Sequence, residues 1–543
     1  MYGLMMNSQL LISTILRHAE RHHPHREIVS ITADNPLHRY TYADCCRRTQ
    51  QLANALDKLG LQRGDRVATV AWNDYRHLEM YYGIGGAGYV CHTINPRIFP
   101  EQIIFIINHS EDKWVFTDPM FVPLLEKIAE HTPGVEGYVV MTNDKNMPAT
   151  TLKNVVSYES LIGAESSEYE WPELDERSAV GLCYTSGTTG DPKGVLYSHR
   201  STILHAYAGI APDVMNLSNR DCVLPVVPLF HVNAWGIPYS ALMVGAKLVF
   251  SGPKMGDGEA LYELLESEEV TLALGVPTVW LALLQYTTKT GKRLNKLQRT
   301  IIGGSAVPAS MIRAFQDDHD VTVNQGWGMT EMSPLGAVNS PKAGMESLSD
   351  DEGVVIATKA GRGIYGCELK IVDAEDNELP WDGVAYGALQ ARGPWVCSDY
   401  FKLEGKGGSH TEDGWLDTGD VATIDSNGYM AITDRTKDVI KSGGEWISSI
   451  EIENTAIGHP AVAEAAVIGV AHPKWTERPL LIVVKTEDQD VSKDQMLAWF
   501  DGKIPKWWLP NDVIFVDALP HTATGKIRKV ELRQQFADYQ LPE

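Results

Sequence analysis

The stretch from Tyr184 to Gly194, Tyr-Thr-Ser-Gly-Thr-Thr-Gly-Asp-Pro-Lys-Gly, combines the residue types that a phosphate-binding loop needs. Its glycines let the backbone approach an anion closely, its hydroxyls offer hydrogen bonds, and Lys193 adds a positive charge. Apolar runs at 180–184 and 195–197 flank it, so we expect a loop between two strands. The residues that this pattern assigns to phosphate binding are Thr185, Ser186, Gly187, Thr188, Thr189, Gly190 and Lys193.

The stretch differs from the best-known phosphate loop, in which a Gly-Lys-Ser/Thr run opens a helix. Here Asp191 and Pro192 separate Gly190 from Lys193, and the lysine leads into a strand. An ordinary Gly/Thr-rich hairpin turn is the alternative. Such a turn needs only about two to five residues and no lysine, so we favour an anion-binding loop.

Composition limits the class of protein. The 543 residues suffice for about three or four core-sized units. The net charge of −23 argues against nucleic acid or an anionic membrane as a partner. The seven cysteines lack a C-x-x-C pair, which indicates neither a disulfide framework nor a zinc site and fits a reducing compartment. The sequence has no secretory signal pattern and no apolar run long enough to span a membrane, so we expect a cytoplasmic protein without integral membrane association.

Two blocks of sequence alternate short apolar runs with helical patterns, which is typical of parallel sheets wrapped by helices. The first block has expected strands at 67–71, 89–93, 114–117 and 138–141, with helices starting at Asp74, Pro100 and Pro119. The second block has expected strands at 223–226, 247–250, 272–274, 300–302 and 321–323. We also expect residues 1–20 to form a core-packing helix. The pattern predicts two α/β subdomains.

Beyond Ala360 the pattern changes to short apolar runs separated by turn signals, which predicts a β-rich layer. A dense charged cluster, 434–438, interrupts these runs. A new helix at 448–457 and new strands follow it, which indicates a small α+β unit of about a hundred residues. We therefore predict an N-terminal domain at 1–433, a hinge at 434–438 and a mobile C-terminal domain at 439–543.

Five motifs in order give the chain a strong resemblance to the adenylate-forming acyl-CoA synthetase superfamily. They are the phosphate loop, Asn-Gln-Gly-Trp-Gly-Met-Thr-Glu at 324–331, Asp-Thr-Gly-Asp at 417–420, Asp-Arg-Thr-Lys-Asp at 434–438 and Thr-Gly-Lys at 524–526. The resemblance covers essentially the whole chain. The segment Phe-His-Val-Asn-Ala-Trp-Gly at 230–236 and the Gly-Trp-Gly-Met-Thr-Glu form are similar to medium-chain acyl-CoA ligases, in particular to the 3-methylmercaptopropionate–CoA ligases of dimethylsulfoniopropionate breakdown.

The resemblance implies an AMP-forming acid–CoA ligase that uses ATP, Mg²⁺ and CoA. In the first half-reaction a carboxylate attacks the α-phosphate of ATP and pyrophosphate leaves. In the second half-reaction the CoA thiol attacks the acyl-adenylate and AMP leaves. Both halves bring anions together, so cations and backbone dipoles are the groups expected to lower the barrier. The acid implied is a short or medium carboxylate, with 3-(methylthio)propanoate as the specific expectation.

The 324–331 motif supplies expected nucleotide and metal residues. By resemblance, Glu331 binds Mg²⁺ and Thr330 lies near the α-phosphate, which makes both catalytic. Trp327, flanked by Gly326 and Gly328, would stack on adenine beside Gly303 and Gly304. Without the motif, Glu331 could be a carboxylate at a helix N-terminus and Trp327 a core residue.

The later motifs supply expected ribose, hinge and adenylation residues. Asp420 and Arg435 would bind the ribose or phosphate, and Lys437 would be the hinge. Lys526 is the expected catalytic lysine that bridges the carboxylate and the α-phosphate, because a compact charge on a long stem can neutralise the reacting centre. Outside this context Asp420 would close a turn, Arg435 would be half of a solvated pair and Lys526 a solvated lysine.

The resemblance also places two substrate-facing surfaces. His231, expected to have a catalytic or gating role, and Trp235 would line the acyl pocket, where the bulk of Trp235 favours a short or medium chain. His231 could instead be a core histidine. The CoA side would carry the Gly-Gly-Glu-Trp run of Gly443, Gly444, Glu445 and Trp446, whose glycines let a pantetheine arm pass close to the backbone.

Other functions remain open at this stage. A general medium-chain fatty-acid–CoA ligase, an adenylating enzyme that loads a carrier protein and a catalytically silent nucleotide-binding protein would share these motifs. The absence of a carrier-like segment favours CoA, and the presence of all the motif residues argues against a silent protein. Relatives also suggest a possible homodimer.

Overall fold

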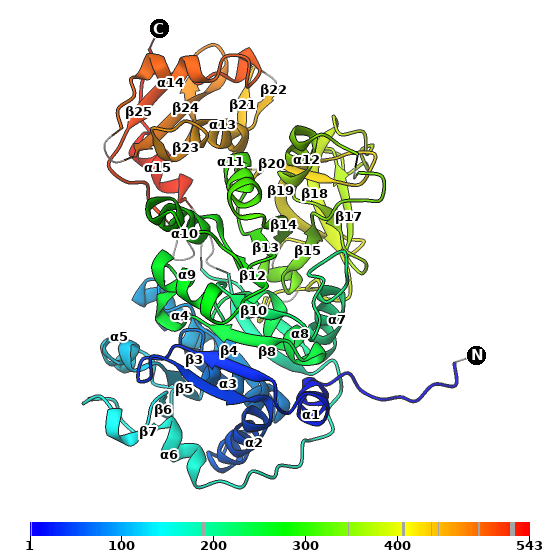
Figure 1. Cartoon of the computed structure of the whole chain (residues 1–543), viewed down its shortest axis with the longest axis vertical. Helices are drawn as coiled ribbons and strands as arrows, with labels where there is room; N and C mark the ends of the chain where they lie inside the picture. The colour runs from blue at the N-terminus through cyan, green and yellow to red at the C-terminus, as the bar shows by residue number, and fades with distance from the viewer. Residues whose placement is uncertain are drawn as a thin grey trace.

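The computed structural model divides the chain into a large N-terminal body and a smaller C-terminal unit, drawn in orange and red at the top of Figure 1. The residues described are 1, 3–185, 191–345, 347–403, 408–435, 437–443, 445–486, 489–521 and 527–542, with only the backbone described for 445 and 446. The α/β fold predicted from the sequence is confirmed.

The first subdomain is a seven-stranded sheet in the order β7-β6-β5-β3-β4-β8-β9. Only the last pair, β8 and β9, is antiparallel. The strands are β3 (Arg66–Val70), β4 (Val90–Thr93), β5 (Trp114–Thr117), β6 (Gly137–Val140), β7 (Val155–Ser157), β8 (Ala179–Tyr184) and β9 (Gly194–Ser198). The helices in this part of the chain are α2 (Tyr42–Lys58), α3 (Tyr75–Gly86), α4 (Pro100–Ser110), α5 (Val122–Ile128) and α6 (Tyr158–Gly163).

The second subdomain is a nine-stranded sheet in the order β16-β15-β14-β13-β12-β10-β11-β1-β2. Its strands are β1 (Glu27–Ser30), β2 (His38–Thr41), β10 (Cys222–Pro225), β11 (Lys247–Phe250), β12 (Leu272–Gly275), β13 (Arg299–Gly303), β14 (Thr322–Gly328), β15 (Leu335–Val338) and β16 (Arg362–Gly363). The helices of this stretch are α7 (His199–Gly209), α8 (Ile237–Val244), α9 (Gly258–Ser267), α10 (Pro277–Thr290), α11 (Ala309–Arg313) and α12 (Asp350–Ala357). The N-terminal strands β1 and β2 were not predicted; they complete this sheet because β1 pairs in parallel with β11.

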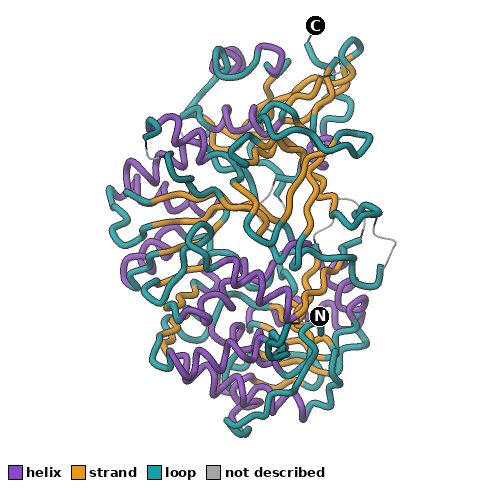
Figure 2. Tube along the Cα trace, turned by 90° about the vertical axis from the view of Figure 1, so that its right-hand side faces the viewer, coloured by secondary structure: helices purple, strands orange, loops and turns teal. Residues whose placement is uncertain are grey.

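The β-rich layer is an antiparallel sheet of β17 (Glu368–Val372), β18 (Tyr386–Arg392), β19 (Leu416–Ile424) and β20 (Met430–Arg435). The C-terminal unit has five strands, β21 (Ile440–Ser442), β22 (Glu445–Ile447), β23 (Val462–His472), β24 (Thr476–Lys485) and β25 (Asp512–Phe515). Its helices are α13 (Ser449–Ile457), α14 (Lys493–Trp499) and α15 (Lys529–Gln535). Figure 2 shows these strands gathered at the C-terminal end of the molecule. The chain passes from β20 to β21 within the predicted hinge, whose bounds stay a prediction.

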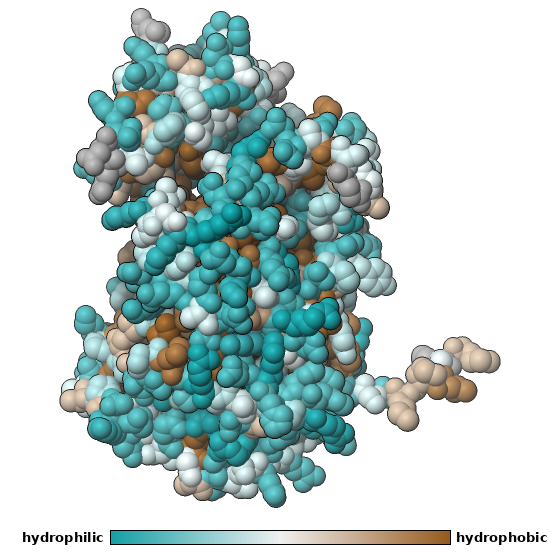
Figure 3. Space-filling model, in the orientation of Figure 1, coloured by the Kyte–Doolittle hydropathy of each residue, from teal (hydrophilic) through white to brown (hydrophobic). Residues whose placement is uncertain are grey.

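The N-terminal segment differs from its prediction, because helix α1 begins only at Ile12 and ends at His22. The N-terminal segment projects from the body, as Figures 1 and 3 show, and the side chains of Met1, Leu4, Met5 and Met6 are exposed. Gly3 disfavours a helix here, and these apolar side chains have no surface to pack on. The rest of the face in Figure 3 is mainly hydrophilic. No helix among the described residues is long and apolar enough to cross a membrane.

The two subdomains are joined by an asparagine just beyond β3. The Asn73 side-chain amide donates to the carbonyls of Pro225 (3.1 Å) and Val227 (2.8 Å), and its oxygen accepts the Leu229 N–H (2.6 Å). Asn73 is fully buried, so leaving these groups unpaired would be costly. The first sheet therefore fixes the loop that leads into His231.

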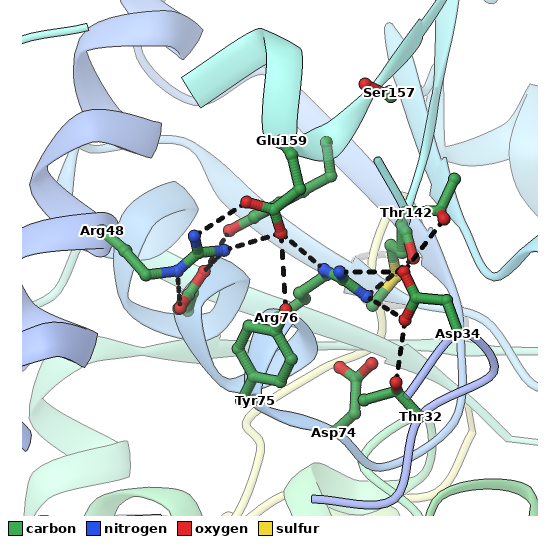
Figure 4. A network of polar contacts seen from close by, with 12 residues as sticks. Thr32, Asp34, Arg48, Asp74, Tyr75, Arg76, Thr142, Ser157 and Glu159 are labelled. Carbon is green, nitrogen blue, oxygen red and sulfur yellow. Dashed lines mark hydrogen bonds and ion pairs between the residues drawn. The ribbon is translucent and has the colours of Figure 1, made fainter. Parts of the chain in front are cut away.

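A network of charged side chains ties several elements of the N-terminal body together (Figure 4). Arg48 of α2 contacts Glu79 of α3 (Nε to Oε1, 2.7 Å) and Glu159 of α6 (Nη1 to Oε2, 2.8 Å). Arg76 of α3 contacts Glu159 (Nε to Oε1, 2.9 Å) and Asp34 (Nη1 to Oδ1, 3.1 Å), which follows β1. These ion pairs connect the loop after β1 with α2, α3 and α6.

Candidate functional site

The predicted phosphate loop connects the antiparallel strands β8 and β9, as the sequence predicted. Its base is closed by a hydrogen bond from the Thr185 N–H to the Lys193 carbonyl (2.9 Å). The segment Ser186, Gly187, Thr188, Thr189 and Gly190 lies outside the described residues. Thr185 and Lys193 therefore mark the two ends of the loop.

Three of the predicted nucleotide residues meet at one carboxylate. The indole Nε1–H of Trp327 donates to Asp420 Oδ2 (2.9 Å). The Arg435 Nε lies 2.8 Å from Asp420 Oδ1, across neighbouring positions of β19 and β20. Asp420 is buried, whereas the Arg435 side chain is 44% exposed. The Trp327 contact brings together the second subdomain and the β-rich layer, two regions far apart in the sequence.

The glycines predicted beside the adenine lie where backbones approach closely. Gly303 and Gly326 are paired in β13 and β14, and a Cβ at Gly303 would lie 2.7 Å from the Gly326 carbonyl and 3.0 Å from the Trp235 ring. A Cβ at Gly328 would clash with the Pro334 carbonyl at 2.0 Å. Gly304 follows Gly303 with a φ of 85°. The end of β13 therefore presents backbone without side chains at Gly303 and Gly304, and the Trp235 indole packs against Gly303.

Thr330 and Glu331 lie on the short turn that follows β14, and both are buried. The Thr330 carbonyl accepts the hydroxyl of Tyr197 (2.8 Å). The Glu331 carbonyl accepts the N–H of Cys397 (2.7 Å), and its carboxylate Oε1 accepts the hydroxyl of Tyr400 (2.7 Å). The carboxylate is thus held by a neutral donor.

Tyr400 and His205 are site residues that the sequence analysis missed. The Tyr400 ring lies under the Lys193 ammonium, with Nζ 4.7 Å from the ring centroid. His205 Nε2 accepts the Leu335 N–H (3.1 Å), so Nδ1 carries the proton, and burial lowers the pKa of His205 to about 4. Neither residue lies in a charged or glycine-rich motif, so no local signal in the sequence marks it.

The segment from His231 to Gly236 has an unusual backbone. The four residues 232–235 have φ values of 47°, 53°, 44° and 55°, which form a left-handed turn of non-glycine residues. Gly236 follows with a φ of 81°, and a Cβ there would lie 2.8 Å from the His205 ring. Strained backbone of this kind clusters at ligand clamps and active sites. The turn places the Trp235 indole on Gly303.

A cavity between α4 and the phosphate loop brings further predicted residues together. His231, Phe230 and Thr185 line it on one side. Polar side chains that the sequence analysis did not single out line it elsewhere: Thr93, Asn95 and Gln102. His231 therefore faces the same space as one end of the phosphate loop.

The predicted hinge is held by the C-terminal unit on both sides. Asp434 Oδ2 accepts the N–H (2.7 Å) and the hydroxyl (2.6 Å) of Ser449, at the start of α13. Asp438 pairs with Arg533 of α15. Lys437 lies between them in sequence and is exposed to solvent.

The predicted CoA-side run lies at the β21–β22 hairpin of the C-terminal unit. Gly443 has a φ of 63°, and the Trp475 and Trp507 rings approach its Cβ position to 3.0 and 3.3 Å. The backbones of Glu445 and Trp446 pair with Ser442 and Lys441. Gly444 and the predicted catalytic Lys526 lie outside the described residues.

The family model described as AMP-binding enzyme matches residues 16–401 of this chain. The model described as AMP-binding enzyme C-terminal domain matches residues 451–526. Together they span most of the chain.

Two curated proteins are 51% identical to this chain over nearly its full length. One is the 3-methylmercaptopropionyl-CoA ligase of Ruegeria lacuscaerulensis, aligned over 99% of both chains. The other is the medium-chain-fatty-acid–CoA ligase of Ectopseudomonas oleovorans, aligned over 99% of this chain and 98% of its own. Among solved structures, the anthranilate CoA ligase AuaEII in complex with anthranoyl-AMP matches with a TM-score of 0.85, 25% identity and 97% coverage of both chains.

Proposed function

The chain belongs to the family of AMP-binding enzymes and is an acyl-CoA ligase, and we propose that its preferred acid is 3-(methylthio)propanoate. The reaction joins this acid to CoA through an acyl-adenylate and produces AMP and pyrophosphate. ATP is the nucleotide substrate, and Mg²⁺ is the expected metal. A general preference for medium-chain fatty acids is the second candidate, since a relative of equal identity carries that name.

The observation that carries the choice of a short acid is the position of Trp235. Its indole lies against Gly303 at the end of β13, on the left-handed turn, where it would narrow the acyl pocket beyond the nucleotide residues. A bulky, partly buried indole there leaves less length for an acyl chain than a small residue would. His231, which lines the neighbouring cavity, would position the carboxylate at its entrance.

The adenylation half-reaction would use the residues around Asp420 and Glu331. Asp420 would accept hydrogen bonds from the ribose hydroxyls, with Trp327 and Arg435 beside the base and the sugar. Lys193 and the loop from Thr185 would hold the β- and γ-phosphates, and Thr330 would lie near the α-phosphate. Lys526 would neutralise the charge that develops as the carboxylate attacks.

The residues at Glu331 fit Mg²⁺. Among the described residues, no group of three or more His, Cys, Asp or Glu side chains is placed to hold a metal alone. Mg²⁺ is usually bound by one or two carboxylates together with substrate phosphates and water, which a single carboxylate beside a phosphate loop would provide. When bound, the ion would neutralise charge on the phosphates.

The second half-reaction would use the C-terminal unit. Rotation about Lys437 would exchange Lys526 for the hairpin of Gly443, Gly444, Glu445 and Trp446, past which the pantetheine arm would reach the adenylate. Asp434 lies in β20 of the N-terminal body and contacts Ser449 of the C-terminal unit, so rotation about Lys437 would have to break this contact. We propose the domain bounds 1–433 and 439–543 because the chain leaves β20 at Arg435 and enters β21 at Ile440.

The cellular setting is also a proposal. All seven cysteines are free thiols and six of them are buried, which suits a reducing compartment such as the cytoplasm. A homodimer is the expected assembly. Sedimentation of the purified protein would test it.

AMP formation with ATP, Mg²⁺, CoA and a panel of acids from acetate to laurate tests the proposed acid, with 3-(methylthio)propanoate and benzoate included. We expect the highest kcat/KM for 3-(methylthio)propanoate, and Trp235→Ala should shift the preference toward longer chains. A maximum at octanoate or longer would favour the medium-chain alternative. Pyrophosphate release that never yields acyl-CoA would indicate a carrier-loading enzyme, and no acid-dependent pyrophosphate at all would indicate a silent nucleotide-binding protein.

A further inference from the structure

Tyr400 contacts both oppositely charged residues of the candidate site. Its hydroxyl donates to Glu331 Oε1 at 2.7 Å, and the Lys193 Nζ lies 4.7 Å from its ring centroid. Tyr400 and Glu331 are 6% and 7% exposed, so the hydrogen bond between them lies largely out of water, whereas Lys193 is partly exposed. One side chain thus connects the turn after β14 with the phosphate loop.

A tyrosine is suited to lie between a cation and an anion. The face of its ring is negative and attracts an ammonium group, whereas its hydroxyl hydrogen is positive and attracts a carboxylate. A phenol is protonated at neutral pH, so the Tyr400 hydroxyl can donate to the Glu331 carboxylate, as the 2.7 Å distance shows.

The position of Tyr400 is fixed by the segment around it. The Phe401 N–H donates to the Gly194 carbonyl (2.8 Å), next to Lys193. On the other side, the Cys397 N–H donates to the Glu331 carbonyl (2.7 Å), and the Trp395 indole donates to the Leu335 carbonyl (3.1 Å). The segment 395–401 is therefore bound to the turn after β14 and the following strand by the Cys397 N–H and the Trp395 indole, and to Gly194 beside Lys193 by the Phe401 N–H.

We propose that Tyr400 is a positioning residue for the adenylation half-reaction. It holds one oxygen of Glu331, which would leave the other oxygen for Mg²⁺, and its ring packs against the Lys193 ammonium, which would bind the phosphates. It also keeps the Lys193 ammonium apart from the Glu331 carboxylate. A direct ion pair between these two side chains would compete with ATP for Lys193 and with Mg²⁺ for Glu331. The inference deepens the proposed function and rests on its assignment of Glu331 and Lys193.

Tyr400→Phe tests the hydroxyl alone, because it keeps the ring under Lys193. The measurement is calorimetric binding of a non-hydrolysable ATP analogue to the full-length protein over a series of Mg²⁺ concentrations. We expect the Mg²⁺ concentration for half-maximal binding to rise roughly tenfold, as the loss of one hydrogen bond to a charged group predicts. Affinity at saturating Mg²⁺ should change by less than about threefold, and Tyr400→Leu, which also removes the seat of Lys193, should weaken it by roughly a further threefold.

Tyr197→Phe is the matched control. Tyr197 is also a buried tyrosine that donates to the same turn, but its partner is the Thr330 carbonyl and not a carboxylate. The Tyr197→Phe variant should keep the Mg²⁺ concentration for half-maximal binding of the ATP analogue within about twofold of the wild-type value. The melting temperatures of the variants, measured alongside, show whether each one is folded.

The outcomes separate this inference from the proposed function. A shift in Tyr400→Phe without a shift in Tyr197→Phe supports the positioning role. An unchanged Mg²⁺ dependence in Tyr400→Phe, or an equal shift in both variants, overturns it. Binding needs no turnover, so failure of the wild type to release pyrophosphate with any acid would overturn the proposed function alone.

Discussion

The charge network around Arg76 and the candidate site around Asp420 and Glu331 are both largely buried, but their charges are paired in different ways. In the network, each guanidinium contacts two carboxylates and each of Arg76 and Glu159 is shared between two partners (Figure 4). In the site, the carboxylates of Glu331 and Asp420 each accept a hydrogen bond from a neutral aromatic donor. The one ion pair described at these two carboxylates uses Arg435, whose side chain is 44% exposed.

This difference separates charges that maintain the fold from charges that remain available to a ligand. The network carboxylates are already paired with arginine, and Glu159 is paired with two arginines. The carboxylate of Glu331 is held by the neutral Tyr400, and that of Asp420 by Trp327 and by the half-exposed Arg435, so a cation or a ribose can compete for them more readily. The comparison predicts that substitutions in the network will affect stability, whereas substitutions in the site will affect activity.

The largest effect on stability is expected for Arg76→Met, which removes the centre of the network. Asp34 and Glu159 would keep their charges without this partner, and breaking a buried pair in this way costs about 3–5 kcal/mol. Urea unfolding at pH 7 measures the loss. The exposed pair of Arg177 and Asp175 provides the control, and Arg177→Met should cost less than about 1 kcal/mol.

The same variant has a pH dependence with a definite sign. Burial alone would raise the pKa of Asp34 and Glu159, but the arginines outweigh burial and lower both. The stability that these carboxylates contribute is therefore present above the pKa of an unfolded carboxyl, about 4, and is lost as the pH falls through their lowered pKa values. The difference between the wild type and Arg76→Met should shrink in acid, and a constant difference from pH 7 to pH 3 would contradict the ion-pair account.

Glu331→Gln, a substitution in the candidate site, should reduce activity strongly and stability little, the opposite of Arg76→Met. The glutamine carbonyl can still accept the Tyr400 hydroxyl, so the free energy of unfolding should change by less than about 1 kcal/mol. The lost charge should reduce acid-dependent pyrophosphate release by roughly a hundredfold, or about 2.7 kcal/mol of transition-state stabilisation. A loss of stability as large as that of Arg76→Met would show that Glu331 is one of the charges that maintain the fold.

A smaller effect is expected at the buried acid pair next to the network. Burial raises the pKa of Asp74 and Asp118, and their mutual repulsion adds to the shift of Asp74. The folded state therefore binds a proton more tightly than the unfolded chain, so this contribution to stability is full below about pH 4 and is lost as the pH rises through the raised pKa values.

Asp74→Asn removes this titration and keeps the helix cap that Asp74 provides to the His77 N–H. We expect the stability of the wild type to decline between pH 5 and pH 8 by about 1 kcal/mol or more relative to the variant. Asp257→Asn, a substitution at an exposed helix cap, is the control and should leave the pH profile unchanged. Parallel profiles for the wild type and Asp74→Asn would exclude a raised pKa at this pair.

The sequence predicted the elements better than it predicted the contacts between them. The alternation of apolar runs located β3, β4, β5 and β10 to within about one residue, because a buried parallel strand needs a continuous apolar run. The pairing of β1 with β11 was missed, because no local pattern reveals which sheet a distant strand will join.

The same limit applies to the candidate site. Its motif residues, such as Trp327 and Asp420, were predicted because their order along the chain resembles that of a known superfamily. Tyr400 and His205 were not predicted, because their roles depend on partners between 69 and 207 residues away, and a lone tyrosine or histidine has no distinctive spacing.

The smallest effect concerns the backbone of the site. Ala234 has a φ of 44° within the left-handed turn that carries Trp235, a conformation that costs an L-residue about 1–2 kcal/mol. Glycine adopts this conformation without that cost, so Ala234→Gly should stabilise the folded state by relieving the strain. The loss of the buried methyl group and the greater freedom of the unfolded chain should destabilise it by about the same free energy. We expect a free energy of unfolding within about 0.5 kcal/mol of the wild type.

Ala53→Gly is the matched control, because Ala53 is equally buried but lies within the right-handed helix α2. There the glycine relieves no strain, and the substitution should cost about 1–2 kcal/mol. Urea unfolding of the two variants compares them directly. Equal losses would mean that the turn is not strained, and the backbone of the site would then resemble that of the structural region, even where its charges differ.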